Sequence, residues 1–388
     1  MWKIAIIPVF GILVLWAWQF FNWVWVKPRK TEKLFRKQGM KGRNYSFIWS
    51  GPRPRVFVMD PDVIREVMTK YHTYHKSYKT SNEIAKMVVT GLINKEGEEW
   101  AKARMKLNPA FHLEKLKLKQ TFLQLSELAF MGKLATNPLT LPGEKYFPTK
   151  KNRRAKEIDK YVRASFTSMI NQRLEKRKAG VKRANQDLLD LFMQELYEGE
   201  NLNDGDRQRI IDDIIGQCKL FFFAGYETNS NLLTWTMIML SAHQDWQARA
   251  REEAVQVLGN KKEITSEDLG KLKIATMILN EMLRLFPSSM EFTRLVEEET
   301  TLDAGEFNPE RFAEGIVKAT KGENVYMPFG WGPRICIAQN FAFLESKTFL
   351  AMLLLNFTFE LSPTYVHAPF VDFTIHPQYG APIVLKKL

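Results

Sequence analysis

Cysteine is almost absent from this sequence: Cys218 and Cys336 are the only two in 388 residues. A chain of this length with 45% hydrophobic residues can build a core without cross-links, so a disulfide framework is not expected. No CxxC pair and no HExxH sequence is present, and the six histidines are scattered, so a structural zinc site has little support. The phosphate-binding sequences GxxxxGK[ST] and GxGxxG are also missing, which argues against direct nucleotide binding.

The overall composition excludes disorder but leaves the partner open. Aromatic residues make up 12% of the chain, too many for a disordered protein. The 56 basic and 43 acidic residues give a net charge of +13, which suits an anionic membrane, an acidic protein or nucleic acid. The basic cluster of Lys150, Lys151, Arg153 and Arg154 is the best nucleic-acid candidate. Such a cluster is usually a solvated helix face, and no nucleic-acid-binding module accompanies it, so no nucleic-acid partner is expected.

The first 26 residues predict a membrane anchor. Residues 4–26 form an apolar run interrupted only by Gln19 and Asn22, and a bilayer-spanning helix needs about 20 residues. Tryptophans crowd the end of the run and six basic residues follow by position 37, so the rest of the chain is expected in the cytosol. A cleaved signal peptide is the alternative, but the run is too long and no small-x-small site closes it. We therefore predict an anchor over 1–26 and one large domain over 27–388.

Periodicity predicts a mainly α fold with small β-sheets. The expected helices cover residues 62–70, 96–105, 155–178, 186–198, 206–242, 244–258, a short helix opened by Ser266, 271–286 and 338–356. The expected strands cover residues 56–59, 357–361, 371–375 and 383–385.

One of the two cysteines lies in a distinctive segment, FGWGPRICIA, at residues 329–338. Its glycines and proline favour an irregular backbone, and Cys336 directly precedes a helix expected from Ala338. Amide groups near a helix start favour a thiolate over a thiol, and Arg334 can reach an acidic group on a ligand. A thiolate on a rigid loop beside an arginine suits an anionic, iron-binding macrocycle. The alternative is that Cys336 is an ordinary buried small hydrophobe.

The stretch Ala224-Gly225-Tyr226-Glu227-Thr228 lies in the middle of the most apolar expected helix. Because Gly225 has no side chain, a ligand can approach the backbone there. Thr228 can bond the carbonyl of Ala224, which can bend the helix and open a groove for dioxygen and water. Glu227 and Thr228 can then relay protons to oxygen. An ordinary buried threonine beside a surface glutamate is the alternative.

Two further pairs are spaced to meet on helix faces. Glu281 and Arg284 are three residues apart among apolar neighbours, so we expect a buried rather than a solvated ion pair. Trp100 and Arg104 are four residues apart, and together they can bind a carboxylate. An exposed amphipathic helix is the alternative for this second pair.

FGWGPRICIA resembles the haem-binding signature of the cytochrome P450 superfamily, F-x-x-G-x-R-x-C-x-G. Phe329, Gly332, Arg334 and Cys336 match, and Ala338 departs from the usual glycine. Residues 224–228, 281–284, 309–312 and 100–104 resemble the family's A/G-G-x-E/D-T, E-x-x-R, P-E-R-F and W-x-x-x-R motifs.

The resemblance implies a role for each matching residue. Cys336 would be the axial ligand of a haem iron, and the other cofactor-binding residues would be Arg334, Trp100, Arg104, Phe329, Gly332, Ala224 and Gly225. Thr228 and Glu227 would be the catalytic pair that delivers protons. A structural triad that braces the cysteine loop would consist of Glu281, Arg284 and Arg311.

The segments GLINKEGEEWAKAR, LSAHQDWQARAREE and QYGAPIVLKKL are similar to the plant clan that includes secologanin synthase, although Ala103 departs from its usual histidine. This implies the cytochrome P450 fold after one transmembrane helix. It also implies a monooxygenase that contains haem b and oxidises a lipophilic, terpenoid-like molecule with O2. Electrons would come from an NADPH-cytochrome P450 reductase. The protein would be a single-pass protein of the endoplasmic reticulum membrane with a cytosolic catalytic domain.

Three blocks of the family pattern are missing from the chain: after Tyr45, between Leu128 and Lys145, and between Thr301 and Ala304. Each loss uncovers apolar partners, and such holes cost several kcal/mol apiece. A second hypothesis is therefore a truncated, catalytically impaired relative that retains the haem-binding motif.

Overall fold

Helices make up most of this computed structural model. It describes residues 14–26, 29–30, 33, 45–50, 53–58, 61–70, 91–107, 149–180, 188–199, 203–259, 261, 264–288, 308–320, 326–371 and 374–388. The labelled α-helices are α3 (Pro61–Thr69), α5 (Gly97–Leu107), α7 (Lys150–Lys178), α8 (Leu188–Phe192), α9 (Gln194–Glu198), α10 (Asp204–Ala242), α11 (Gln244–Leu258), α12 (Ser266–Lys271), α13 (Lys273–Leu285), α14 (Ile316–Ala319) and α15 (Gln339–Asn356). Shorter helical turns are η1 (Asn22–Val26), η2 (Gly91–Asn94), η5 (Pro309–Phe312) and η6 (Gly332–Arg334).

The described strands form three antiparallel pairs. They are β1 (Tyr45–Ser50) with β2 (Arg53–Val58), β3 (Phe357–Leu361) with β6 (Ile383–Lys387), and β4 (Pro369–Val371) with β5 (Ile375–Pro377). The predicted strand 371–375 is wrong, because Val371 and Ile375 lie opposite each other on β4 and β5. Two short strands joined by a short connection can show the same alternation of apolar and polar residues as one longer strand. The sequence pattern alone therefore did not separate the two cases. The mainly helical fold with small sheets is confirmed.

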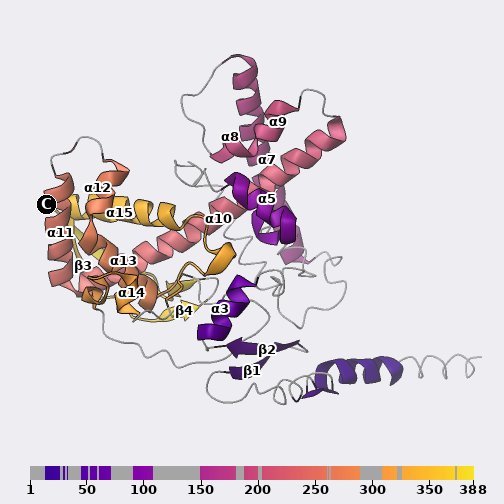
Figure 1. Ribbon diagram of the computed structural model, residues 1–388, viewed down its shortest axis with the longest axis horizontal. Coiled ribbons are helices and arrows are strands. Elements are labelled where there is room, and N and C mark those ends of the chain that lie inside the picture. The colour runs from indigo at the N-terminus through magenta and orange to yellow at the C-terminus, as the bar shows by residue number, and fades with distance from the viewer. Residues whose placement is uncertain are drawn as a thin grey trace, which may run out of the picture.

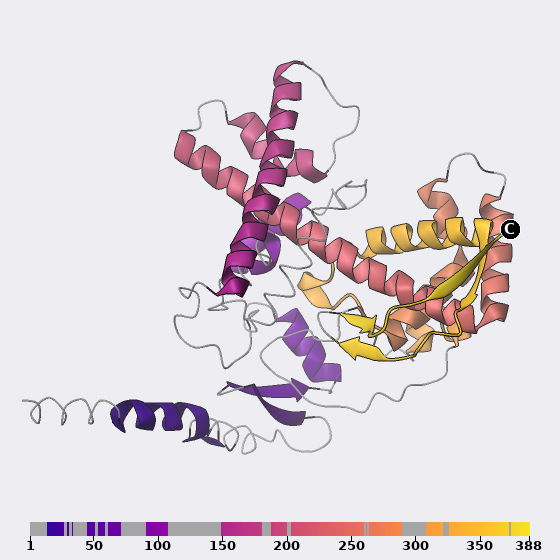
Figure 2. The ribbon, with the colours of Figure 1, turned by 180° about the vertical axis from the view of Figure 1, so that it is seen from behind.

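Helix α10 organises the molecule. It is 39 residues long, and its N-cap Asn203 accepts a hydrogen bond from the N–H of Asp206 at 2.8 Å. Figure 1 shows α10 running from the lobe formed by α7, α8 and α9 to the lobe formed by α11 to α15, and Figure 2 shows the same arrangement from behind. The two lobes correspond to two apolar clusters, to which α10 contributes residues 210–222 and 232–240 respectively.

A third, smaller apolar cluster joins the N-terminal part of the domain to α10. Its buried members are Leu92, Trp100, Leu107 and Leu220. Ile337, next to Cys336, packs against this cluster. The cysteine loop, α5 and α10 therefore meet at one place.

Some helix boundaries differ from those predicted. The helix expected over 186–198 breaks at the buried Met193 into α8 and α9. The N-cap before Ser266 is Thr265, which forms a capping box with Asp268. A further break at Leu272 separates α12 from α13, so the helix expected from residue 271 begins at Lys273.

Within the described ranges, no helix is long and apolar enough to cross a bilayer. Residues 14–21 are helical, and residues 1–13, which hold much of the predicted span, lie outside the described residues. The two predicted gaps between Leu128 and Lys145 and between Thr301 and Ala304 also lie outside them.

Candidate active site

Cys336 ends a short loop that is held by main-chain hydrogen bonds. Its N–H donates to the carbonyl of Phe329 at 2.8 Å, and the N–H of Ile335 donates to the carbonyl of Gly332 at 3.0 Å. Gly330 and Gly332 have φ angles of +77° and +70°, in the left-handed region that glycine tolerates best. The Cys336 residue is exposed, whereas Cys218 is buried in the core. The loop thus presents one accessible sulfur from a fixed backbone.

Gly332 has a second reason to be glycine. A Cβ atom built on it would lie 2.6 Å from the carbonyl oxygen of Met68 and 3.3 Å from the Cα of Thr69. These are main-chain atoms at the end of α3, so they cannot rotate away. The cysteine loop therefore packs directly on α3, and this contact requires the glycine.

Arg334 is buried beside the cysteine. Its side chain is only 3% exposed, and it forms an ion pair with the carboxylate of Glu96. It also donates to the carbonyl of Lys95 at 3.2 Å and lies 4.4 Å above the centre of the Trp100 ring. The indole face stabilises the guanidinium by a cation–π contact.

Arg104 supplies a second guanidinium near the same sulfur. Partial burial lowers the pKa of Arg104, while the negative charge of Cys336 raises it and the positive charge of Arg334 lowers it. Arg104 therefore lies close enough to Cys336 and to Arg334 for the charge of each to act on it. Together with Trp100, they form a cluster suited to a thiolate ligand and to carboxylate groups.

The middle of α10 has an open face. Ala224, Gly225 and Tyr226 are exposed, although the helix is largely buried on either side of them. A Cβ built on Gly225 would meet no described atom within 4 Å. The hydroxyl of Thr228 donates to the carbonyl of Ala224 at 2.7 Å, as predicted, and the helix continues through this bond. Backbone at this point is accessible to a flat ligand.

Glu227 faces a different group of residues from Thr228. One of its carboxylate oxygens, Oε1, accepts hydrogen bonds from Thr374 at 3.0 Å and from Asn231 at 3.3 Å, and it lies 4.0 Å from Nδ1 of His376. Consecutive helical residues point about 100° apart. Glu227 is therefore held toward β5.

The residues predicted as a structural triad lie together. The guanidinium of Arg284 donates to both carboxylate oxygens of the fully buried Glu281, at 2.7 and 2.9 Å. The Nε of Arg311 lies 3.5 Å from the same carboxylate, and the N–H of Asn308 donates to it at 2.9 Å. Tyr326 packs nearby, and burial together with the charge of Glu281 raises its pKa. The carboxylate thus ties α13 to η5.

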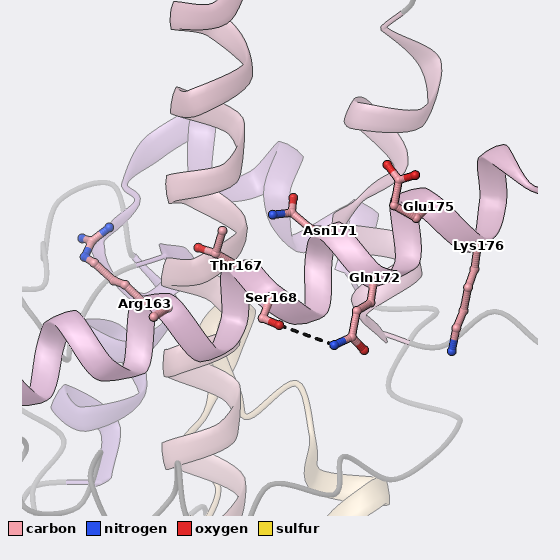
Figure 3. Close-up of a pocket in the computed structure, with 8 residues that line it drawn as sticks. Arg163, Thr167, Ser168, Asn171, Gln172, Glu175 and Lys176 are labelled. Carbon is pink, nitrogen blue, oxygen red and sulfur yellow. Dashed lines mark hydrogen bonds between the residues drawn. The ribbon is translucent and has the colours of Figure 1, made fainter.

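A separate groove of about 780 Å³ runs along α7 (Figure 3). Its described lining residues all come from this one helix: Arg163, Ala164, Thr167, Ser168, Asn171, Gln172, Glu175 and Lys176. The groove lies open on one face of a single helix, whereas ligand sites usually enclose most of the surface of their ligand. None of the residues predicted for the active site lines this groove.

The structure thus brings the predicted site residues together in three groups. These are the cluster around Cys336, the open face of α10, and the Glu281 carboxylate of α13 with its arginine partners. Sequence reasoning missed several of their partners, namely Glu96, Asn231, Thr374, His376 and Tyr326. The contact of Asn231 with Glu227 could have been predicted, because residues four apart share a helix face. The contacts of Thr374 and His376 could not, since these residues lie in or beside a short strand far along the chain.

A sequence model of the cytochrome P450 family matches residues 13–131, 120–305 and 302–378. The chain belongs to the cytochrome P450 family. It is 37% identical to cytochrome P450 CYP72A219 of Panax ginseng over 508 aligned positions, covering 97% of each chain. It is 35% identical to 7-deoxyloganic acid hydroxylase of Catharanthus roseus over 520 positions, covering 100% of this chain and 99% of the relative.

A third relative is secologanin synthase 2 of Catharanthus roseus, with 34% identity over 98% of this chain and 96% of the relative. The fold is similar to that of retinoic acid-bound cyanobacterial CYP120A1, with a TM-score of 0.69 and 20% identity over 92% of this chain and 94% of that one. This P450 is therefore a plant enzyme of the CYP72 clan and a monooxygenase.

The family and fold imply a haem iron, a redox partner and a small-molecule substrate. The residues present in the site fit a haem group. An exposed sulfur on a fixed loop can bind iron, two guanidinium groups and an indole can bind carboxylates, and an open helix face beside Gly225 leaves room for a flat ring.

Proposed function

We propose that this P450 binds haem b through the thiolate of Cys336 and inserts one oxygen atom of O2 into a lipophilic, terpenoid-like molecule. One observation carries the proposal: the exposed Cys336 lies on a hydrogen-bonded loop within reach of Arg104 and Arg334. The names of the relatives, which include a 7-deoxyloganic acid hydroxylase, support a terpenoid-like substrate.

Each part of the site has a task in this proposal. When bound, haem supplies an iron whose thiolate ligand favours O–O bond cleavage. Arg104, Arg334 and Trp100 bind the carboxylates of the cofactor. Phe329 and Gly332 fix the cysteine loop, and Ala224 and Gly225 leave space over the backbone of α10. Thr228 and Glu227 deliver protons.

Electrons are proposed to come from an NADPH-cytochrome P450 reductase, docked by a basic surface near the cysteine loop. We further propose that residues 1–26 form a single-pass anchor in the endoplasmic reticulum membrane, with residues 27–388 in the cytosol. The apolar run at 4–26 and the basic residues after it support this orientation.

The proposal is tested by the CO-difference spectrum of the reduced protein, expressed at full length and supplied with hemin. We expect the Soret band of a thiolate-ligated haem. Cys336→Ser should abolish this band and turnover, because a serine hydroxyl does not replace the thiolate. The matched control is Cys218→Ala, which removes the buried cysteine and should leave the band in place. A full thiolate band in Cys336→Ser would overturn the assignment.

A second candidate function, a truncated relative impaired in catalysis, is favoured by the comparisons. The aligned lengths of 508 and 520 positions exceed the 388 residues of the chain, although nearly the whole length of each relative is covered. The family match is also divided near residues 120–131 and 302–305, close to two of the three predicted gaps. Relatives therefore carry internal segments without a counterpart here.

Haem content and turnover separate the two candidates. An active enzyme should bind about one haem per chain and oxidise 7-deoxyloganic acid or a related terpenoid when reductase and NADPH are added. An impaired relative should show substoichiometric or rapidly lost haem and no product. Stable haem with turnover would show that the missing blocks are harmless.

A further inference from the structure

The carboxylate of Glu227 lies at the end of a row of hydrogen-bonded side chains. Thr374 Oγ1 donates to Glu227 Oε1 at 3.0 Å, and Nδ1 of His376 lies 3.3 Å from the same threonine oxygen. Asn231 contacts two members of the row, because its amide group donates to Thr374 Oγ1 at 2.7 Å and to the Glu227 main-chain carbonyl at 2.9 Å. The row leads from α10 to β5.

The donors and acceptors of these side chains fix the direction of the hydrogen bonds in this row. A threonine hydroxyl has one hydrogen to donate and two lone pairs to accept with. Its hydrogen goes to Glu227, because a carboxylate only accepts, and one lone pair takes the amide hydrogen of Asn231. His376 can then contact Thr374 only as a donor, so its Nδ1 carries a hydrogen. Every bond in the row therefore points toward Glu227.

Burial differs along the row. Thr374 is only 3% exposed, whereas the side chain of His376 is 32% exposed and that of Glu227 is 18% exposed. The imidazole is thus the member of the row most open to solvent. The exposed edge of this imidazole can exchange a proton with water, because each ring nitrogen can donate or accept a hydrogen bond.

The row is also held in place by the core. Nε1 of Trp235, which is 1% exposed, donates to the carbonyl of Ile375 at 2.7 Å, and its ring stacks on Phe286 at 4.1 Å. Ile375 lies between Thr374 and His376. The buried indole therefore sets the position of both side chains relative to α10.

We propose that His376 and Thr374 supply protons to Glu227, with Asn231 as the residue that positions them. This inference rests on the proposed function, because insertion of oxygen consumes two protons: RH + O2 + 2 H⁺ + 2 e⁻ gives ROH + H2O, with both electrons coming from the redox partner. The Nδ1 proton of the imidazolium passes to Thr374 Oγ1 while the hydroxyl proton of Thr374 passes to Glu227. Neutral imidazole and a carboxylic acid remain, and water reprotonates the imidazole.

The first test needs no turnover. In protein labelled with 15N-histidine, the His376 ring signals are assigned by their loss in His376→Gln. We expect a protonated Nδ1 in the unmodified chain at neutral pH, and a change of its signal in Thr374→Val. An unprotonated Nδ1 in the unmodified chain would overturn the proposal, because Thr374 would then donate to His376 instead of Glu227.

The second test measures product formed and hydrogen peroxide released per NADPH oxidised. His376→Gln and Thr374→Val should lower product formation about tenfold and raise peroxide release, with KM for substrate unchanged, as expected for loss of proton transfer. Thr374→Ser keeps the hydroxyl and should restore coupling.

The matched control is His243→Gln, since His243 is the C-cap of α10 and lies sixteen residues after Glu227 along the helix. It should behave as the unmodified enzyme. Unchanged coupling in both His376→Gln and Thr374→Val would overturn the proposal. Absence of the thiolate Soret band from the unmodified protein would instead refute haem binding by Cys336. The 15N experiment would still test the hydrogen-bonded row in that case.

Discussion

Replacing Arg284 with alanine measures how strongly the Glu281 carboxylate depends on its ion pair. Glu281 is fully buried, and Arg284 donates to both of its oxygens at 2.7 and 2.9 Å. The hydrogen bond to Glu281 is also the largest contribution that raises the pKa of Arg284, so this guanidinium stays charged. Removing it leaves a buried carboxylate with fewer donors.

The loss of stability in Arg284→Ala depends on the contacts that Glu281 keeps. Breaking a buried ion pair by removing one partner costs about 3–5 kcal/mol. In Arg284→Ala, Arg311 at 3.5 Å and the N–H of Asn308 at 2.9 Å still contact Glu281. We therefore expect a loss of about 3 kcal/mol in the free energy of unfolding, near the lower end of that range.

Arg311→Ala is the matched control. Arg311 is 38% exposed and makes the longer contact, so its removal should cost about 0–1 kcal/mol. Both variants are compared with the unmodified chain by urea unfolding followed by circular dichroism. Equal losses in the two variants, or a loss below about 1 kcal/mol in Arg284→Ala, would refute the view that Arg284 is the main partner of Glu281.

Two further predictions concern packing and a second buried charge. Gly332→Ala should destabilise the protein by about 1–2 kcal/mol from its left-handed backbone alone, and more from the contact with Met68, as measured by thermal unfolding and haem retention. Lys219 is 1% exposed and pairs with Asp159, and burial lowers its pKa. Lys219→Met should therefore change the free energy of unfolding little, since Asp159 keeps Arg163 at 2.9 Å, whereas Asp159→Asn should cost about 3 kcal/mol in the same urea experiment. A larger loss in Lys219→Met than in Asp159→Asn would contradict this ranking.

Local spacing in the sequence predicted much of the fold. The helix 244–258 and the strand 357–361 have the predicted bounds, because each has a clear apolar period and a sharp end. Contacts between residues three or four apart were also predictable, such as Arg284 with Glu281 and Thr228 with the Ala224 carbonyl. The helical period alone determines such pairs.

Contacts between distant parts of the chain were not predictable in this way. The sequence assigned Arg334 to a ligand but did not predict its ion pair with Glu96, 238 residues earlier. The sequence assigned Glu227 and Thr228 to proton delivery but did not predict that Glu227 accepts a hydrogen bond from Thr374, 147 residues later. These partners depend on how separate elements pack together, and no periodicity within one element encodes that packing.

The open stretch of α10 also bears on how the molecule unfolds. Between Phe223 and Leu232 the helix contributes no residue to any of the described apolar clusters, a distance of roughly 12 Å along its axis. Each lobe therefore has its own core, and the empty protein can lose one lobe while the other stays folded. A large apolar ring seated at this stretch would bury surface from both sides. Binding of the cofactor would then couple the two lobes, so that they unfold together in a single transition. The fraction of protein with cofactor bound would thus set the cooperativity of unfolding.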